Sequence, residues 1–374
     1  MKYKLSDICN YAKGKINIDL LNEDTYISTE NMMSNKGGIT RASSLPTMTQ
    51  TQAFSAGDVL VSNIRPYFKK IWYAEYDGGC SNDVLVFRAK DGVSKRFIYY
   101  VLADDAFFDF SMATSKGTKM PRGDKVAIME YEVTKFTYEE QEKIAGILEV
   151  FDRKIQINKD INDNLFQQAQ LLFKDRFVDM APFDRIMPND WHEGTVSEII
   201  ELHDSQRIPL SSRERADLAK IYPYYGATSV MDYVDRYLFD GIYLLLGEDG
   251  TVVDAKGFPI LQYVEGKFWV NNHAHIITGK NGFSVELLYL LFSMTNVQSI
   301  VTGAVQPKIS QANLNKIPIV IPSMAELQSF DSIVQPIFSQ TRDLRSENNR
   351  LANIRDTLLP RLMSGELDVS DVAI

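Results

Sequence analysis

The sequence contains few of the side chains that most often build catalytic and metal sites. It has two cysteines, Cys9 and Cys80, and four histidines among 374 residues. The cysteines form no Cys-x-x-Cys pair, and no histidine lies in a His-Glu-x-x-His sequence. We therefore expect no disulfide scaffold, no resident metal, and a chain that works in the reducing cytoplasm.

Long apolar runs, phosphate-binding glycine loops and excess positive charge are also missing. No run is long enough to span a membrane, and neither a Gly-x-x-x-x-Gly-Lys-Ser/Thr loop nor a Gly-x-Gly-x-x-Gly turn occurs after a strand. The net charge of −9 excludes a protein that coats nucleic acid through bulk charge. Residues 182–323 carry the largest acidic excess, with 16 acidic against 11 basic residues. Contact with nucleic acid would need local basic patches, or a partner that neutralises phosphates.

One long helical pattern dominates what is present, and the chain repeats it. Within residues 139–179, seam positions alternate four and three apart, as in a coiled coil, at Ile144, Leu148, Phe151, Ile155, Asn158, Asn162, Leu165, Ala169, Leu172 and Arg176. Adding 186 to each number gives the same seam, at Phe330, Val334, Ile337, Thr341, Leu344, Asn348, Leu351, Arg355, Leu358 and Leu362. Because apolar seams are buried most simply against each other, we predict an antiparallel pair in which Asn162 and Asn348 set the register. Two unrelated amphipathic helices are the alternative.

The segment before each helix follows one plan, so the duplication covers a head as well as a helix. The first head has strand patterns at 3–8, 58–62, 83–87 and 126–133 and a helical pattern at 97–109. The patterns at 3–8, 58–62 and 97–109 have counterparts at 195–200, 243–246 and 285–293, and a pattern at 317–322 leads into the second long helix as 126–133 leads into the first. The predicted fold class is α+β, with two mixed α/β domains separated by two long antiparallel coiled-coil helices and an internal pseudo-twofold duplication. The predicted segments are a first head, a central helix, a second head, a C-terminal helix and a tail, at 1–138, 139–181, 182–323, 324–365 and 366–374.

Three short sequences have an enzymatic interpretation beside a structural one. The run Asn63–Phe68 resembles the Asn/Asp-Pro-Pro-Tyr/Phe loop of amino-methyltransferases, but it lacks the first Pro and a preceding glycine-rich loop. Asp254 with Glu265–Lys267 resembles a nuclease carboxylate–lysine triplet, although a hairpin turn at the Glu-Gly of that run explains it equally well. His273 and His275 would share one face of a strand as metal ligands, but a hydrogen-bonded polar strand is favoured. We assign no catalytic residue and no metal ligand.

The remaining polar clusters suit DNA and fall at corresponding points of the two heads. Guanidinium and amide groups pair with base edges, while lysines contact phosphates. In the first head the candidates are Ser62, Asn63, Arg65, Tyr67, Lys69 and Lys70, with Lys116, Lys119 and Arg122 in the loop before the helix. In the second head they are Arg207, Tyr222, Tyr224, Tyr225, Thr228, Asn271, Asn272, His273 and Lys308. Glu248 and Asp249 could accept from a cytosine amino group, although a turn is the favoured interpretation.

Several runs give the whole chain a family resemblance. In the first half these are Lys116–Arg122 and the helix start at Glu140-Gln141, and the chain closes with Leu358–Leu367. The more specific runs lie in the second head, at Ile221–Ala227, Asp240-Gly241, Gly247–Gly250 and Trp269–His275. In these runs, and in its head–helix–head–helix order, the chain resembles the DNA-specificity subunits of type I restriction–modification systems.

The resemblance implies a non-catalytic subunit of a methyltransferase and endonuclease complex. Each head would be a target-recognition domain that reads one half of an asymmetric, bipartite site in double-stranded DNA. The helices would set the spacer and dock two methyltransferase subunits, and restriction and translocase subunits would join the full complex. S-adenosylmethionine, ATP and Mg²⁺ would belong to those partners, so no cofactor and no membrane contact are expected for this chain. A stand-alone nuclease or methyltransferase and a two-headed protein-binding scaffold are the alternatives.

Overall fold

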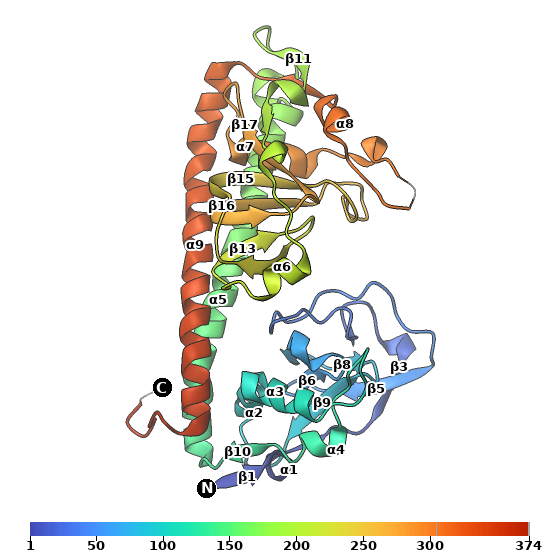
Figure 1. The fold of residues 1–374 in the computed structure, drawn as a ribbon, viewed down its shortest axis with the longest axis vertical. Coiled ribbons are helices and arrows are strands. Elements are labelled where there is room, and N and C mark those ends of the chain that lie inside the picture. Colours follow the sequence, from blue (N-terminus) through green and yellow to red (C-terminus); the bar gives the residue numbers. More distant parts are fainter. Residues whose placement is uncertain (304, 373–374) are drawn as a thin grey trace. The chain divides into compact units, whose positions relative to one another are not determined.

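The computed structural model describes residues 1–303 and 305–372, which form two compact units. Unit 1 consists of Met1–Ile157 and Glu347–Ile374, and unit 2 of Asn158–Ser346. The unit boundaries fall inside the two long helices and not at the ends of the heads. Each unit therefore contains one head and one part of each helix (Figure 1).

The first head combines sheets with short helices. Its strands are β1 (Lys2–Lys4), β2 (Cys9–Tyr11), β3 (Lys15–Asn17), β4 (Tyr26–Ile27), β5 (Gln50–Phe54), β6 (Val59–Ser62), β7 (Ile71–Tyr73), β8 (Gly78–Cys80), β9 (Val84–Ala89) and β10 (Glu132–Thr134). Its helices are α1 (Leu5–Ile8), α2 (Lys95–Ala103), α3 (Asp105–Ala113) and α4 (Lys125–Ile128). The strand orders are β2-β9-β6-β7, β3-β5-β8-β4 and β1-β10.

The second head is built around one larger sheet. Its strands are β11 (His192–Thr195), β12 (Ile200–Leu202), β13 (Tyr222–Tyr225), β14 (Val230–Val234), β15 (Phe239–Gly247), β16 (Leu261–Val270), β17 (Ala274–Gly279) and β18 (Pro318–Ile321). Its helices are α6 (Ser212–Ala216), α7 (Val285–Met294) and α8 (Gln311–Asn315). The strand orders are β12-β17-β15-β16-β13-β14 and β11-β18. The predicted α+β class is confirmed.

The two heads share an antiparallel core with one strand order. The order β2-β9-β6-β7 of the first head corresponds to β12-β17-β15-β16 of the second. The register also corresponds. The next-to-last residue of β6, Val61, pairs with Leu85 of β9, and the next-to-last residue of β15, Leu246, pairs with His275 of β17. The β-branched and leucine-rich runs of these central strands are buried on both faces, as such runs predict. The duplication predicted from the sequence is therefore confirmed at the level of strand topology.

Two long helices, α5 (Tyr138–Phe173) and α9 (Met324–Ser364), contribute to both units. α5 begins where Thr137 and Glu140 cap each other. The Thr137 N–H donates to the Glu140 carboxylate at 2.7 Å, and the Glu140 N–H donates to the Thr137 hydroxyl at 3.3 Å. A π-helical turn at Lys174–Val178 follows the end of α5. Across residues 1–303 and 305–372, no helix combines the length and apolar character that crossing a membrane requires.

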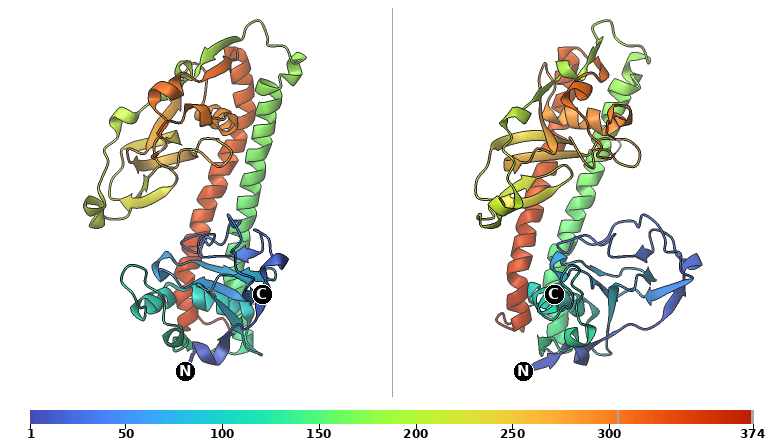
Figure 2. Two further views of the ribbon diagram at one scale, coloured as in Figure 1. Left: turned by 90° about the vertical axis from the view of Figure 1, so that its right-hand side faces the viewer. Right: turned by 45° about the vertical axis from the view of Figure 1, so that its right-hand side comes forward.

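Within unit 1, the start of α5 packs against the end of α9. Ile144 and Leu148 share one apolar core with Leu359 and Leu362 and with the first head. Farther along α5, Asp152 accepts a hydrogen bond from the Arg355 guanidinium at 2.6 Å. Early residues of α5 thus meet late residues of α9 in this unit, where the right-hand view of Figure 2 shows the two helices next to each other. The predicted antiparallel arrangement is confirmed within this unit.

Within unit 2, the end of α5 packs against the start of α9, but the buried stripe departs from the predicted seam. The rings of Phe173 and Phe177 lie 5.9 and 4.9 Å from the ring of Phe330, centroid to centroid. Leu172, a predicted seam residue, is 43% exposed, so its assignment to the helix pair is wrong. An α-helix has 3.6 residues per turn, and a strict seven-residue repeat therefore drifts by about 20° per heptad. Phe173 takes the inward position that the heptad pattern assigns to Leu172.

The other predicted seam positions vary in burial. The buried positions are Ile144, Leu148, Asn158, Ala169, Phe330, Val334, Thr341 and Leu362. The half-buried positions are Phe151, Ile155, Asn162, Leu165, Arg176, Ile337, Leu344, Asn348, Leu351, Arg355 and Leu358. The pairing of Asn162 with Asn348 stays a prediction.

Four predicted elements differ from those in the structure because side chains cap helical turns there. The helical pattern at 97–109 breaks into α2 and α3 at Asp104, whose carboxylate accepts from the Ala106 N–H at 3.0 Å. The predicted strand at 126–133 instead contains α4, which the Asp124 carboxylate caps, and only its end belongs to β10. The predicted strands at 3–8 and 195–200 are each interrupted by a helical turn, at Leu5–Ile8 and Val196–Glu198.

Candidate nucleic-acid interface

In the first head, two loops that are far apart in the sequence meet beyond the end of β6. The Arg65 N–H donates to the Pro121 carbonyl at 2.8 Å, and the Gly123 N–H donates to the Asn63 carbonyl at 3.3 Å. Loop 116–122 closes into a hairpin through two backbone hydrogen bonds, 2.9 and 3.0 Å long, between its first and last residues. The fold thus joins two groups of candidate DNA-binding residues.

Two buried polar atoms of this joined region have no hydrogen-bonding partner within the described part of the chain. They are the side-chain oxygen of Asn63 and the Nε atom of Arg65. Arg65 has a φ of 51°, in the left-handed region, and so does Lys69. For a residue other than glycine this conformation costs about 1–2 kcal/mol. Unpaired polar atoms and strained backbone often mark functional sites, because a ligand can supply the missing contacts.

The lysines beside Arg65 are held by acidic and carbonyl groups. The ammonium groups of Lys36 and Lys69 each lie 2.8 Å from the Asp105 carboxylate. Burial alone would raise the pKa of Asp105, but these two cations outweigh it and lower that pKa. Lys70 donates to the Thr29 carbonyl at 2.7 Å, and burial lowers the pKa of Lys70. Lys36 was not among the sequence candidates, since only the folded loop brings it to Asp105.

The hairpin cations of the first head are also paired with carboxylates. Arg122 lies 3.1 Å from Asp83, and Lys116 lies 2.5 Å from Asp124. The pKa of Asp124 is lowered to about 2, first by the hydrogen bond from Lys116 and then by hydrogen bonds from two backbone N–H groups. Lys119 is exposed near the hairpin tip. Exposed ion pairs are worth little in water, so these cations can exchange their acids for phosphates at small cost.

The second head repeats the loop geometry with different side chains. The Gly250 N–H donates to the Pro307 carbonyl at 2.9 Å, and the Ile309 N–H donates to the Glu248 carbonyl at 2.9 Å. Two backbone hydrogen bonds of 2.8 and 2.7 Å join Thr302 to Lys308, as in the first hairpin. By these bonds the equivalent positions are Asn63 and Glu248, Arg65 and Gly250, Pro121 and Pro307, and Gly123 and Ile309.

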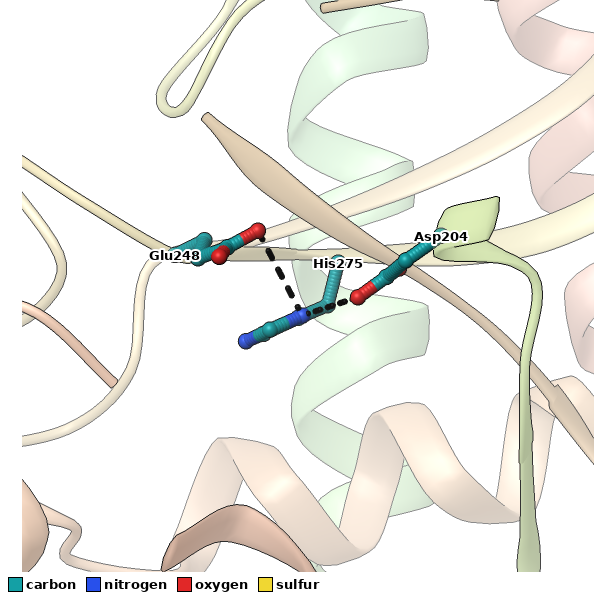
Figure 3. A group of neighbouring side chains, drawn as sticks. All are labelled: Asp204, Glu248 and His275. Atoms are coloured by element: carbon teal, nitrogen blue, oxygen red, sulfur yellow. Dashed lines mark hydrogen bonds and ion pairs between the residues drawn. The ribbon is translucent and has the colours of Figure 1, made fainter. Parts of the chain in front are cut away.

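Asp204, Glu248 and His275 form a buried ion network in the second head (Figure 3). His275 is fully buried, with Nδ1 2.6 Å from an Asp204 oxygen and Nε2 2.8 Å from the Ile309 carbonyl. Glu248 lies 3.7 Å from the same Nδ1 and 2.5 Å from the Arg207 guanidinium. Burial alone would raise the pKa of Asp204 and of Glu248. Contact with His275 lowers the pKa of Asp204, contacts with Arg207 and His275 lower that of Glu248, and in both carboxyls these contacts outweigh burial.

The same residues have the composition of a metal site. Among the described residues, the ligand atoms of Asp204, Glu248 and His275 all lie within 4.8 Å of one another. Both ring nitrogens of His275 already face hydrogen-bond acceptors, however. The Arg207 guanidinium also places a fixed positive charge against both carboxylates, 3.5 Å from Asp204. The arrangement therefore fits an internal ion network better than a cation site.

Several sequence candidates lie inside the heads. Tyr224 is 1% exposed, and its hydroxyl accepts from the Leu210 N–H at 2.9 Å. The prediction that Tyr224 contacts DNA is wrong, because this residue of β13 points into a small core. Ser62, Asn63 and Asn271 are also buried, and the Arg207 guanidinium is used within the ion network. Such residues support loops and do not form the surface.

The other candidates reach the surface, and their contact with DNA stays a prediction. The exposed residues are Tyr67, Lys116, Lys119, Arg122, Thr228, Asn272 and Lys308. The partly exposed residues are Arg65, Lys69, Lys70, Tyr222, Tyr225 and His273. His273 also contacts Asp249.

Two residues of the nuclease-like triplet, Asp254 and Glu265, make separate structural contacts. The Asp254 carboxylate caps a turn by accepting from the N–H groups of Lys256 and Phe258 at 2.8 and 2.9 Å. Glu265 lies 3.5 Å from Arg342 of α9. The predicted turn at Glu265-Gly266 is wrong, because both residues lie within β16 and pair with β15.

The comparisons with known proteins match both halves of the duplicated chain. A family model described as the type I restriction modification DNA specificity domain matches residues 1–167 and 188–354. The MjaIX type I restriction enzyme specificity subunit of Methanocaldococcus jannaschii is 26% identical over 310 residues, which cover 76% of this chain and 71% of that protein. The HindI type I restriction enzyme specificity subunit of Haemophilus influenzae is 23% identical, over 98% of this chain and 99% of that one.

A solved structure shows the same fold. The S subunit of a type I restriction–modification system from M. genitalium matches with a TM-score of 0.51 and 20% identity, over 97% of this chain and 96% of that one. The two family-model matches together span most of the sequence, one for each head with its helix. This chain therefore belongs to the family of type I restriction–modification DNA specificity subunits.

Proposed function

We propose that this chain is the non-catalytic DNA-recognition subunit of a type I restriction–modification complex. Each head reads one half of a bipartite, asymmetric site in double-stranded DNA. The two long helices set the spacer between the halves and dock two methyltransferase subunits, and restriction and translocase subunits join the full complex. S-adenosylmethionine, ATP and Mg²⁺ act on those partners, while this chain supplies recognition and assembly.

The repeated loop pair is the observation that carries this proposal. Equivalent backbone positions hold Asn63 and Arg65 in the first head and Glu248 and Gly250 in the second. Two loop pairs that share one backbone geometry and carry unlike side chains suit two targets that share one shape and differ in sequence. The half-sites of an asymmetric DNA site are such targets, because duplex shape repeats while the base edges differ.

The charges of the loops indicate how this chain would bind. Several surface cations near the hairpins, including Lys69, Lys116, Arg122 and Lys308, are paired with carboxylates. DNA phosphates can take the place of these carboxylates, and affinity should then fall as salt rises. With a net charge of −9, the chain is expected to need its methyltransferase partners for tight binding.

Selection from a randomised duplex library tests the proposal. The chain in complex with its methyltransferase partner should enrich one split motif with two unlike half-sites. No enrichment would contradict DNA recognition and would favour a protein-binding scaffold. Cleavage or methyl transfer by the chain alone, abolished by Asn63→Ala or Glu265→Ala, would show instead that it is a stand-alone enzyme.

A further inference from the structure

We infer that the buried network of Asp204, His275 and Glu248 is a positioning device for the recognition loops of the second head, with His275 held as an imidazolium cation. The inference rests on the proposed function and deepens it, because it assigns residues to the specificity of one half-site. The three residues come from separate parts of the head. Asp204 follows β12, Glu248 follows β15, and His275 lies in β17.

The charge of His275 follows from its two partners. A backbone carbonyl can only accept a hydrogen bond, so Nε2, 2.8 Å from the Ile309 carbonyl, must carry a hydrogen. Nδ1 faces the Asp204 carboxylate at 2.6 Å. That carboxylate already accepts from the Ile276 N–H at 2.9 Å and the Gln311 amide at 2.5 Å, as an ionised group does. Both ring nitrogens therefore donate, which only the imidazolium form can do.

Neighbouring charges balance this buried cation. The carboxylates of Asp204 and Glu248 lie 2.6 and 3.7 Å from Nδ1 of His275. The Arg207 guanidinium lies 3.5 Å from Asp204 and 2.5 Å from Glu248. Two acids thus face two buried cations. The Lys308 ammonium reaches Glu248 from the rim at 3.1 Å, with 48% of its side chain exposed.

The hydrogen bonds of the network end on the segments that carry exposed candidate residues. The Ile309 carbonyl, which His275 holds, directly follows Lys308. Arg207 donates to the Ala274 carbonyl at 2.8 Å, directly after His273. Because the network fixes the backbone beside Lys308 and His273, it fixes where their side chains emerge. Contact residues must be held within about half an ångström of their binding positions, and hydrogen bonds behind them provide that support.

The first head shows that the strands do not need such a network. By strand register, Leu85 of β9 holds the place of His275, and Asn63 holds the place of Glu248. Leu85 is 3% exposed and builds the same four-stranded core with an apolar side chain. Buried ion networks are often less stabilising than apolar residues of similar volume. The role of the network in the second head is therefore to position the loops and not to stabilise the fold.

The test compares His275→Leu, the residue of the first head, with a matched control. The control is His192→Leu, in the same head but outside the network, with a side chain 60% exposed. Each variant is studied in complex with the methyltransferase partner by selection from a randomised duplex library, and its thermal midpoint is recorded. The wild type and the control should select both half-sites. His275→Leu should keep the first half-site and lose discrimination at the second by about tenfold or more.

An unchanged second half-site in His275→Leu would overturn the inference. If His275→Leu does not fold, Glu248→Gln decides by the same selection, because this substitution keeps the shape and removes a charge. Nitrogen NMR of the chain labelled at histidine shows which ring nitrogens carry a hydrogen. A role of His275 in packing alone would not require a hydrogen on both. Both ring nitrogens of His275 should carry a hydrogen in the folded chain, as their two acceptors require, and a neutral tautomer would also overturn the inference. A wild-type complex that selects no motif would contradict the proposed function itself, which is a different outcome.

Discussion

The backbone N–H of Arg65 donates to the carbonyl of Pro121 at 2.8 Å, and the second head builds the same bond from Gly250 to Pro307 at 2.9 Å. Both donors have positive φ values, 51° for Arg65 and 83° for Gly250. Glycine adopts this conformation freely, whereas arginine does so at a cost. The first head therefore retains a strained arginine at a position where the duplicated head has a glycine, which points to a role for the Arg65 side chain.

Arg65→Ala should relax the preference for one base pair of the first half-site. The guanidinium can pair with a base edge, and its loss should cost about 1–3 kcal/mol of discrimination. Lys69→Ala should instead weaken binding to all sequences about equally, since an ammonium contacts phosphates. Dissociation constants for a set of duplexes with single base changes separate the two effects. Uniform losses in both variants would assign Arg65 to the phosphate backbone.

Gly250→Arg should add a base preference to the second half-site. A Cβ atom added at Gly250 meets no atom within 4 Å, so the first atom of a side chain has room there. The positive φ should cost about 1 kcal/mol of stability, and Gly250→Ala measures this cost alone. Library selection with both variants would detect the new preference. A Gly250→Arg protein with the wild-type motif would show that this position does not face DNA.

The end of α5 offers a matched pair of adjacent residues. Phe173→Ala should lower the free energy of unfolding by about 3–5 kcal/mol, because Phe173 is buried against Phe330. Leu172→Ala should cost less than about 1 kcal/mol, since Leu172 is 43% exposed. Urea unfolding of the two variants measures the difference. Similar losses would contradict the observed shift of the buried stripe.

Acid should destabilise the second head through Asp204 and Glu248. Their pKa values are lower in the folded protein than in ordinary carboxyls, so the unfolded chain binds more protons as the pH falls. Their stabilising contribution is complete above the unfolded pKa of about 4 and is lost as the pH falls through the lower folded values. Thermal midpoints measured from pH 6 downward should fall more steeply in the wild type than in Asp204→Asn. Parallel curves would exclude Asp204 from the acid response.

Lengthening both helices should change the spacer and leave the half-sites unchanged. Seven residues inserted beside Asn162 and seven beside Asn348 add about 10 Å of helix, or about three base pairs of duplex. Methylome sequencing of a host that expresses the variant with its partners would give the new motif. The same spacer in a folded, active variant would contradict the proposed role of the helices.

Local patterns in the sequence were sufficient for the architecture. Apolar periodicity repeats within a helix, so the seams of α5 and α9 and their 186-residue offset could be read directly. A loop before the first long helix was also predicted, but its closure into a hairpin, and the matching bonds between Thr302 and Lys308, became visible only in the backbone hydrogen bonds. The helix break at Asp104 was missed, because a capping aspartate looks like any polar position on a helix face.

Which candidate residues reach the surface was decided only by tertiary structure. Tyr224 resembled a surface residue of an aromatic loop, but the pairing of β13 turns it into a core. The sequence alone gave no sign that His275 would meet Asp204 and Glu248, because that meeting depends on strand order and register. A one-residue change of register reverses the face of every side chain, and long-range strand pairing sets this register. The residue types that suit DNA are thus a local property of the chain, whereas the fold determines which of them reach the surface and which support it from behind.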